Sequence, residues 1–237
     1  MDSDDYIAEY SINNLCEVAF EKNLDMIFFD IKRVTNEEEK KCTYKEVDIN
    51  KIVTGREYFA KNNVNNGPWH YFIRKNFIKS NKLLFERDKY CEDGMFLITA
   101  LINAKRVSYI RVDFYRYVYR KNSTTTKKNK KHNIKMIEDF MHTILYLNAL
   151  YNKDLKENNI NNFNLRLKDR INSYIFFMQI RMIRNRIGKD QAKKYIQELK
   201  KAKLYKYERL DRKIYPGIKY DILNIIFNWE NLFYLLV

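Results

Sequence analysis

Residues 90–126, YCEDGMFLITALINAKRVSYIRVDFYRYVYRKNSTTT, contain the change of hydrophobic period that decides the predicted fold. Between Met95 and Ile102 the apolar residues fit a helix that buries one side. From Val107 to Tyr119 apolar and polar residues alternate instead, which is typical of a strand. The aromatic and β-branched run from Met26 to Val34 predicts a second, buried strand. Helix and strand therefore alternate up to about residue 120, and the sequence predicts a mixed α/β layer structure.

The flanking stretches extend this prediction in both directions. Residues 6–19 have helical spacing behind an acidic start, residues 35–50 look like an exposed loop, and a short helix is predicted around residues 58–59. The C-terminal half has helical periodicity over 133–152, 158–187, 190–203 and 218–235. The character changes near residue 127, which predicts one domain over 1–126 and a helical region over 127–237.

The charge of the chain points to an anionic partner. Lys and Arg number 45 against 30 Asp and Glu, which gives a formal net charge of +15 over 237 residues. The partner could be nucleic acid, an acidic membrane surface or a phosphorylated small molecule, and part of the lysine excess could equally be a solvated face without a ligand.

Cysteine usage and hydropathy indicate the compartment. Cys16, Cys42 and Cys91 are odd in number and far apart, as expected of reduced thiols in a cytoplasmic protein. No signal sequence begins the chain and no apolar run is long enough to span a bilayer, so we expect neither secretion by that route nor a membrane span.

Two acidic clusters are candidates for chemistry. Asp2, Asp4 and Asp5 could hold a hard cation such as Mg²⁺ or Mn²⁺, or could simply cap a helix N-terminus. Glu92 and Asp93 begin a predicted helix, where one carboxylate could act as a general base or the pair could be an ordinary acidic first turn.

Two aromatic segments have alternative interpretations. In GPWHYF the Trp follows a turn and is most often a core residue. In YRYVYRKNST, Arg116, Arg120 and Lys121 stand beside aromatic rings, which suits phosphate or nucleic-acid bases, although a charged edge strand is the commoner meaning. His70, His132 and His142 form no ligand pattern.

Taken in order, DSDDYI, a strand, GPWHYFIRKNFIKSNKLLF, YCEDGMF and YRYVYRKNST resemble the second half of a family 2 glycosyltransferase catalytic domain. The resemblance covers residues 1 to about 126. It implies the GT-A fold, a Rossmann-like α/β arrangement, and an inverting enzyme that uses nucleotide sugars. The family's domain normally begins with a β-α-β nucleotide-binding half, so the resemblance implies a chain truncated at its N-terminus, directly before the metal motif.

The resemblance assigns the donor side to four residues. Asp2 and Asp4 fall on the DxD pattern that holds Mn²⁺ or Mg²⁺ against the nucleotide diphosphate, and Asp5 adjoins it. Arg120 lies in the segment that can fold over the diphosphate.

The resemblance assigns the acceptor side and the base to five more. Asp93 falls on the catalytic base, with Glu92 beside it. Trp69 and the turn at Gly67 fall on the segment that borders the acceptor, and His70 replaces the small residue often found after that Trp.

The function implied is transfer of a sugar from a nucleotide-sugar donor to a glycan or lipid-linked acceptor in cell-surface polysaccharide synthesis. The C-terminal segment YDILNIIFNWENLFYLLV could lie on an anionic inner leaflet, at the cytoplasmic face, or could be a packed helical appendage. The alternative function is a basic, non-catalytic nucleic-acid-binding module. The sequence contains no zinc-finger or recognition-helix signature that would support it. An inactive remnant or a partner subunit is a third reading.

Overall fold

The computed structural model describes residues 5–9, 12–35, 41–42, 51–119 and 130–237. Contacts divide the chain into two compact units, Met1–Glu86 with Phe96–Lys127, and Arg87–Met95 with Lys128–Val237. The division at 126/127 stays a prediction, since the contacts also assign residues 87–95 to the second unit.

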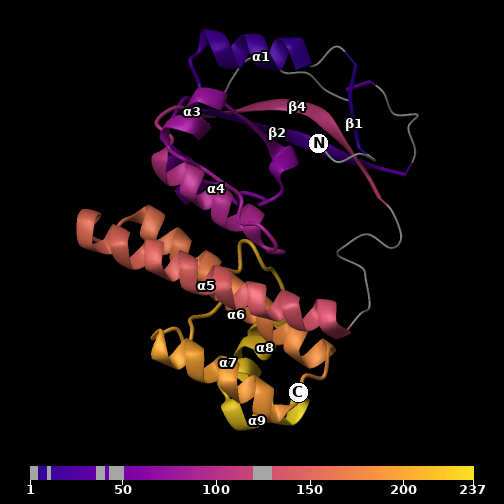
Figure 1. Ribbon diagram of the computed structural model, residues 1–237, viewed down its shortest axis with the longest axis vertical. Coiled ribbons are helices and arrows are strands. Elements are labelled where there is room, and N and C mark those ends of the chain that lie inside the picture. Colours follow the sequence, from indigo (N-terminus) through magenta and orange to yellow (C-terminus); the bar gives the residue numbers. More distant parts are fainter. Residues whose placement is uncertain (1–4, 10–11, 36–40, 43–50, 120–129) are drawn as a thin grey trace. The chain divides into compact units, whose positions relative to one another are not determined.

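The first unit is built around a four-stranded sheet in the order β1-β4-β2-β3 (Figure 1). The strands are β1 (Tyr6–Ile7), β2 (Met26–Val34), β3 (Tyr71–Ile73) and β4 (Val107–Val118). The long central strands β2 and β4 run parallel, and each pairs with a short antiparallel neighbour. The predicted strands at 26–34 and 107–119 are thus confirmed, and β4 is an inner strand of the described sheet, not the charged edge strand considered from sequence.

Helices cover both faces of this sheet (Figure 1). On one face, Leu15 of α1 (Ile12–Glu21) belongs to an apolar cluster with alternate residues of the central strands, including Ile27, Phe29 and Phe114. On the other face, Phe28 stacks on Tyr58 of α2 (Gly55–Lys61), with ring centroids 4.5 Å apart. The remaining elements of the unit are η1 (Pro68–His70), α3 (Lys75–Ser80) and residues 96–103 of α4 (Glu92–Asn103).

One glycine allows α2 to approach α4 closely. A Cβ at Gly55 would lie 2.2 Å from the carbonyl oxygen of Leu101, a distance that no side chain tolerates. The predicted short helix near residue 58 is present as α2. It begins at a glycine, whose lack of a side chain permits the close approach to α4.

The predicted helix over 6–19 is wrong in its first part. Tyr6 and Ile7 pair with Arg116 and Tyr115 as β1, and the helix begins only at Ile12. An aromatic residue followed by a β-branched one suits a strand, and the backbone groups of β4 supply hydrogen-bond partners that local periodicity cannot reveal.

Asp25 joins three distant parts of the first unit. Its Oδ2 accepts hydrogen bonds from the backbone N–H groups of Lys105 at 2.9 Å and Arg106 at 3.1 Å, and its Oδ1 pairs with Arg74. The carboxylate thus fixes the starts of β2 and β4 beside each other at the end of β3.

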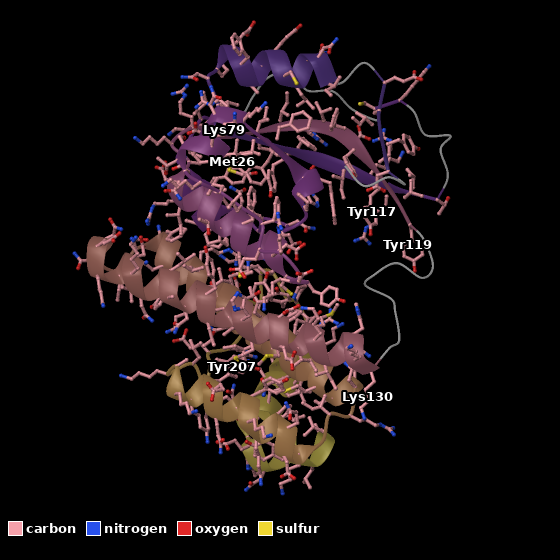
Figure 2. All side chains as sticks on the ribbon, viewed as in Figure 1. Met26, Lys79, Tyr117, Tyr119, Lys130 and Tyr207 are labelled. Atoms are coloured by element: carbon pink, nitrogen blue, oxygen red, sulfur yellow. The ribbon has the colours of Figure 1, made fainter. Side chains whose placement is uncertain are left out.

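The second unit is helical. Besides residues 92–95 of α4, its elements are α5 (Lys130–Asn158), α6 (Asn162–Arg184), α7 (Lys189–Lys201), α8 (Ile218–Asn228) and α9 (Glu230–Leu236). Gln179 lies in its core, where its Nε2 donates to the carbonyl of Phe227 at 3.1 Å and its Oε1 accepts from Tyr207 at 2.8 Å (Figure 2 labels Tyr207). The helical prediction for this half is confirmed, except that the stretch 218–235 is broken at Trp229. Among the described residues no helix has the length and apolar character that crossing a bilayer demands.

Candidate active site

Glu92 and Asp93 occupy the first turn of α4, as the sequence predicts for the acidic pair. Both belong to the second unit. Asp93 Oδ1 accepts a hydrogen bond from the N–H of Gly94 at 2.7 Å. Burial nevertheless raises the pKa of Asp93, and the backbone N–H groups and the positive charge of Arg170 offset it only in part. A half-buried carboxylate with a raised pKa is the kind of group that removes a proton from a hydroxyl.

Glu92 is also held away from water. Its Oε2 is buried without a hydrogen-bond partner among the described residues. Burial raises the pKa of Glu92, and the negative charges of Asp93 and Asp139 add to the effect. For both carboxylates, desolvation therefore outweighs the favourable helix N-terminus on which the sequence interpretation relied.

Asp139 of α5, which sequence analysis missed, holds the segment that precedes the acidic pair. Its side chain is 2% exposed, and Oδ2 accepts from the backbone N–H of Tyr90 at 3.1 Å and from Lys135 Nζ at 3.1 Å. Lys89 Nζ lies 3.4 Å from Oδ1. Asp139 thus positions the entry to α4. The sequence signal that could have identified Asp139 is a carboxylate beside Phe140 and Met141 in an otherwise apolar helical face.

Cys91, between Tyr90 and Glu92, is not a nucleophile. Burial raises the pKa of its thiol to about 12, and the nearby carboxylate of Asp93 adds to the shift. At neutral pH the sulfur is protonated and serves as a small apolar side chain.

The three predicted acceptor residues lie together in the first unit. Gly67 precedes η1, and Trp69 and His70 are within it. A Cβ at Gly67 would stand 2.4 Å from the indole of Trp69, so glycine is what lets the ring fold back over the turn. The indole packs on Tyr117, with ring centroids 5.4 Å apart. Trp69 is half-buried, so it is only in part the core aromatic residue that the sequence suggests.

His70 borders a cavity of about 530 Å³ that also belongs wholly to the first unit. Asp30 lines it at a β-bulge in β2, and accepts a hydrogen bond from the Tyr109 hydroxyl at 2.6 Å. Burial raises the pKa of the Tyr58 phenol, and Asp30 adds to the shift, so Tyr58 stays a neutral donor. The other polar lining residues are Lys51, Glu57, Lys61, Asn62, Asn63 and Asn65.

We expect His70 to make folding stability depend on pH. Burial lowers the pKa of His70 from 6.5, and Arg33 contributes to the shift while Asp30 opposes it. Below 6.5 the unfolded chain binds this proton more readily than the folded one, so the free energy of unfolding falls as pH falls through that window. Urea unfolding at a series of pH values checks this, and His70→Gln should remove this contribution to the pH dependence.

A matched variant, His142→Gln, should keep that pH dependence. If wild type and His70→Gln lost stability equally on acidification, the assignment to His70 would be wrong.

The predicted donor residues are only partly within the described chain. Asp2, Asp4 and Arg120 lie outside the described residues, and so does the proposed metal site. Asp5 is buried, and both carboxylate oxygens bind within the first unit: Oδ1 accepts from the N–H of Val118 at 2.9 Å and Oδ2 from the Tyr115 hydroxyl at 2.8 Å. Asp5 therefore fixes the start of β1 against the end of β4.

No cluster of three or more His, Cys, Asp or Glu side chains that could hold a metal ion occurs among the residues that the structure describes. The proposed Mn²⁺ or Mg²⁺ remains a prediction that depends on Asp2 and Asp4.

Arg116 is not available to a phosphate or a nucleic acid. The side chain is fully buried, donates to the carbonyl oxygens of Asp113 and Lys41, and lies 3.4 Å from the Asp113 carboxylate. The alternation of β4 places this arginine in the core of the sheet, which corrects the interpretation of Arg116 as a phosphate or nucleic-acid contact, while Arg120 and Lys121 lie outside the described residues.

The structure thus groups the predicted residues into two described sets. Gly67, Trp69 and His70 share the turn at η1 in the first unit, and Glu92 and Asp93 share the first turn of α4 in the second. The candidate base and the predicted acceptor segment therefore belong to different units.

No protein-family model matches the chain, and no curated protein matches it in sequence. Among solved structures it is similar to S. aureus TarS, a glycosyltransferase, with 17% identity and a TM-score of 0.51 over 98% of this chain and 38% of that one. TarS 1–349 in complex with UDP-GlcNAc aligns at 17% identity and a TM-score of 0.44, over 78% of this chain and 57% of that one. TarS 1–349 in complex with UDP aligns at 18% identity and a TM-score of 0.42, over 98% of this chain and 64% of that one.

The chain therefore spans 38% to 64% of the length of these TarS structures. At such identities the likeness describes architecture, and it confirms the predicted mixed α/β class. The chain has a glycosyltransferase-like fold.

Proposed function

We propose that this chain forms part of a glycosyltransferase that moves a sugar from a nucleotide-sugar donor to a saccharide or lipid-linked saccharide. The observation that carries the proposal is the half-buried Asp93 carboxylate with a raised pKa on the first turn of α4, in a fold similar to that of TarS. The cellular process we propose is cell-surface polysaccharide synthesis at the cytoplasmic face of the membrane.

The chemistry is a single displacement of the family 2, inverting type. Asp93 takes the proton of an acceptor hydroxyl as its oxygen attacks the anomeric carbon, and the bond to the nucleotide diphosphate breaks with inversion. Glu92, desolvated beside it, is the second carboxylate of the pair. Asp139 has a positioning role, because it binds the backbone of the segment that leads into α4.

The donor would be held by residues at the two ends of the first unit. We propose that Asp2 and Asp4 bind Mn²⁺ or Mg²⁺, whose preference for oxygen ligands suits both carboxylates and a diphosphate. The cation would offset charge on the leaving diphosphate when bound. Arg120 would contact the diphosphate, and Asp5 would keep the motif beside the end of β4.

The acceptor side would be the turn at Gly67 with the cavity beside His70. The cavity contains two carboxylates, two lysines and three asparagines, so its charges balance, which favours a neutral, hydroxyl-rich ligand over a polyanion. Asp30 and the asparagines offer acceptors and donors for sugar hydroxyls, and Trp69 offers an aromatic face nearby in sequence.

We expect Asp4→Asn to weaken metal-dependent nucleotide binding by tenfold or more, because an amide is a much poorer ligand than a carboxylate for a hard cation. Calorimetric titration of UDP with and without Mn²⁺ measures the effect. Glu9→Gln, at an exposed position a few residues away, is the matched control and should bind like wild type. Equal Mn²⁺-dependent binding by Asp4→Asn and wild type would refute the metal assignment, and no binding by wild type would count against the donor proposal itself.

A further inference from the structure

Helix α8 buries two polar side chains, Asp221 and Asn224, together with Phe227. The side chains of Ile218, Ile222 and Ile225 on the helix, and of Trp229 directly after it, are 75%, 50%, 67% and 61% exposed. Water normally draws polar residues to the outer face of a helix, so this arrangement indicates a surface that is covered when the protein works.

The inward polar residues are satisfied, so the orientation of α8 is well specified. Asp221 pairs with Arg209 and Arg212, the latter at 2.7 Å. Asn224 Nδ2 lies 3.4 Å from the carbonyl oxygen of Glu208, and Asn228 Nδ2 donates to the carbonyl oxygen of Tyr207 at 3.1 Å. Turning the isoleucines inward would break these contacts.

The three outward isoleucines form one narrow line. They recur at intervals of four and three, which keeps them on a single side of the helix over about 10 Å, and Trp229 directly follows the last residue of the helix. We name Ile218, Ile222, Ile225 and Trp229 the α8 stripe. Its four side chains are far fewer than the about 20–30 residues that each partner contributes to a stable protein interface. A line of this shape suits shallow insertion at a bilayer surface, and Trp is the residue that favours the membrane–water boundary.

The charge around the α8 stripe is positive. Lys219 is exposed on the helix itself, and Arg209, Arg212 and Lys213 come from the segment before it. The carboxylates of the same region are fewer: Glu208 pairs with Lys168 at 2.5 Å, Glu230 with Lys200 at 2.6 Å, Asp221 with the two arginines, and Asp211 accepts from the backbone N–H of Lys213 at 2.8 Å. Six cations thus stand against four carboxylates. Cations beside an apolar line complement acidic lipid headgroups.

We propose that the α8 stripe binds a membrane surface rich in anionic phospholipid, with the isoleucines and Trp229 entering the headgroup boundary and the flanking cations contacting lipid phosphates. This surface does not depend on the proposed sugar transfer. Vesicle binding needs no donor or acceptor, so its failure and a failure of catalysis are separate results.

The test is co-sedimentation of the full chain with vesicles of phosphatidylcholine, alone or mixed with phosphatidylglycerol. We expect binding to the mixed vesicles, weakened by salt because the headgroup attraction is screened. The variant Ile222→Ser/Ile225→Ser should bind them at least tenfold less, since two apolar groups no longer enter the lipid. Ile160→Ser is the matched control, because Ile160 is 74% exposed outside the α8 stripe, and it should bind like wild type.

A second measurement keeps the result independent of sedimentation. In a Trp69→Phe background Trp229 is the sole tryptophan, since the chain has 2, and its fluorescence should shift to shorter wavelength with anionic vesicles. Equal binding by Ile222→Ser/Ile225→Ser and wild type, or no binding to anionic vesicles, would overturn the proposal. A dimer that the double variant abolishes, without vesicle binding by wild type, would assign the α8 stripe to self-association instead.

Discussion

Replacement of Asp93 by Asn is expected to raise the stability of the fold while removing most sugar transfer. In any form of the protein with measurable transfer, we expect a fall of about 10²–10⁴-fold, because the amide keeps the shape of the carboxylate but cannot accept the acceptor's proton. Nucleoside diphosphate release measures transfer, and urea unfolding of the same variant measures stability.

The sign of the stability change follows from the direction of the pKa shift. Burial raises the pKa of Asp93 above its ordinary 3.8. As pH rises from 3.8 to the higher pKa of the folded state, the unfolded chain loses the Asp93 proton first. The free energy of unfolding therefore falls over this range. Asp93→Asn removes a charge that is unfavourable in the fold at neutral pH, and its stability should lose this part of the pH dependence.

Asp139→Asn is the matched control, since it changes a carboxylate of the same unit that is paired. It should lower stability by about 2 kcal/mol, because the Lys89 and Lys135 ammonium groups lose their charged partner. Transfer by Asp93→Asn within a few-fold of wild type would show that another group is the base.

The second large effect is expected from Arg116→Met. This substitution removes the cation that faces the 2%-exposed Asp113 carboxylate, and it also removes donors to two backbone carbonyls. Leaving such a charge buried should cost about 3–5 kcal/mol in the free energy of unfolding. Circular dichroism during urea unfolding provides the measurement.

Two further variants test the cause of that loss. Asp113→Asn in the Arg116→Met background should restore part of the stability, because the buried side chain then carries no charge. Arg111→Met changes an exposed arginine of the same strand and should cost about 1 kcal/mol or less. If Arg116→Met behaved like Arg111→Met, the burial of Arg116 would have no energetic importance.

The sequence predicts the central strands because their signal is local. The run from Met26 to Val34 begins with four consecutive apolar residues, all of which are buried, and the alternation after Val107 is long. The pairing of Tyr6 with Arg116 is not predictable in this way, because a strand of two residues has no period of its own and depends on a partner 110 positions away. The same reason hides the burial of Arg116, whose surroundings come from another strand and from Lys41.

Of the candidate site, too, only the part with a local signal could be predicted from the sequence. The acidic pair at Glu92 and Asp93 is visible as a motif, and its position at a helix start follows from local pattern. The opposing effect of burial on the pKa of Asp93 depends on side chains of other helices, and the contact from Asp139 crosses 49 positions to reach Tyr90. The outward face of α8 is periodic in sequence, yet periodicity gives no sign of which side faces water, and apolar residues are by default assigned to the inside.

The contact of Asp25 with Lys105 has a consequence for the order in which the first unit folds. The carboxylate and the amide that it binds are 80 positions apart, and the whole parallel pairing of β2 with β4 has the same long separation. Closing so large a loop is entropically costly, so the central sheet forms late, after α2 and α3 have had time to form from local contacts. During synthesis the aromatic run of β2 waits without its parallel neighbour until residue 118 has left the ribosome. For that interval the edge of β2 that later meets β4 has unpaired backbone groups, and such an edge is prone to pair with another chain.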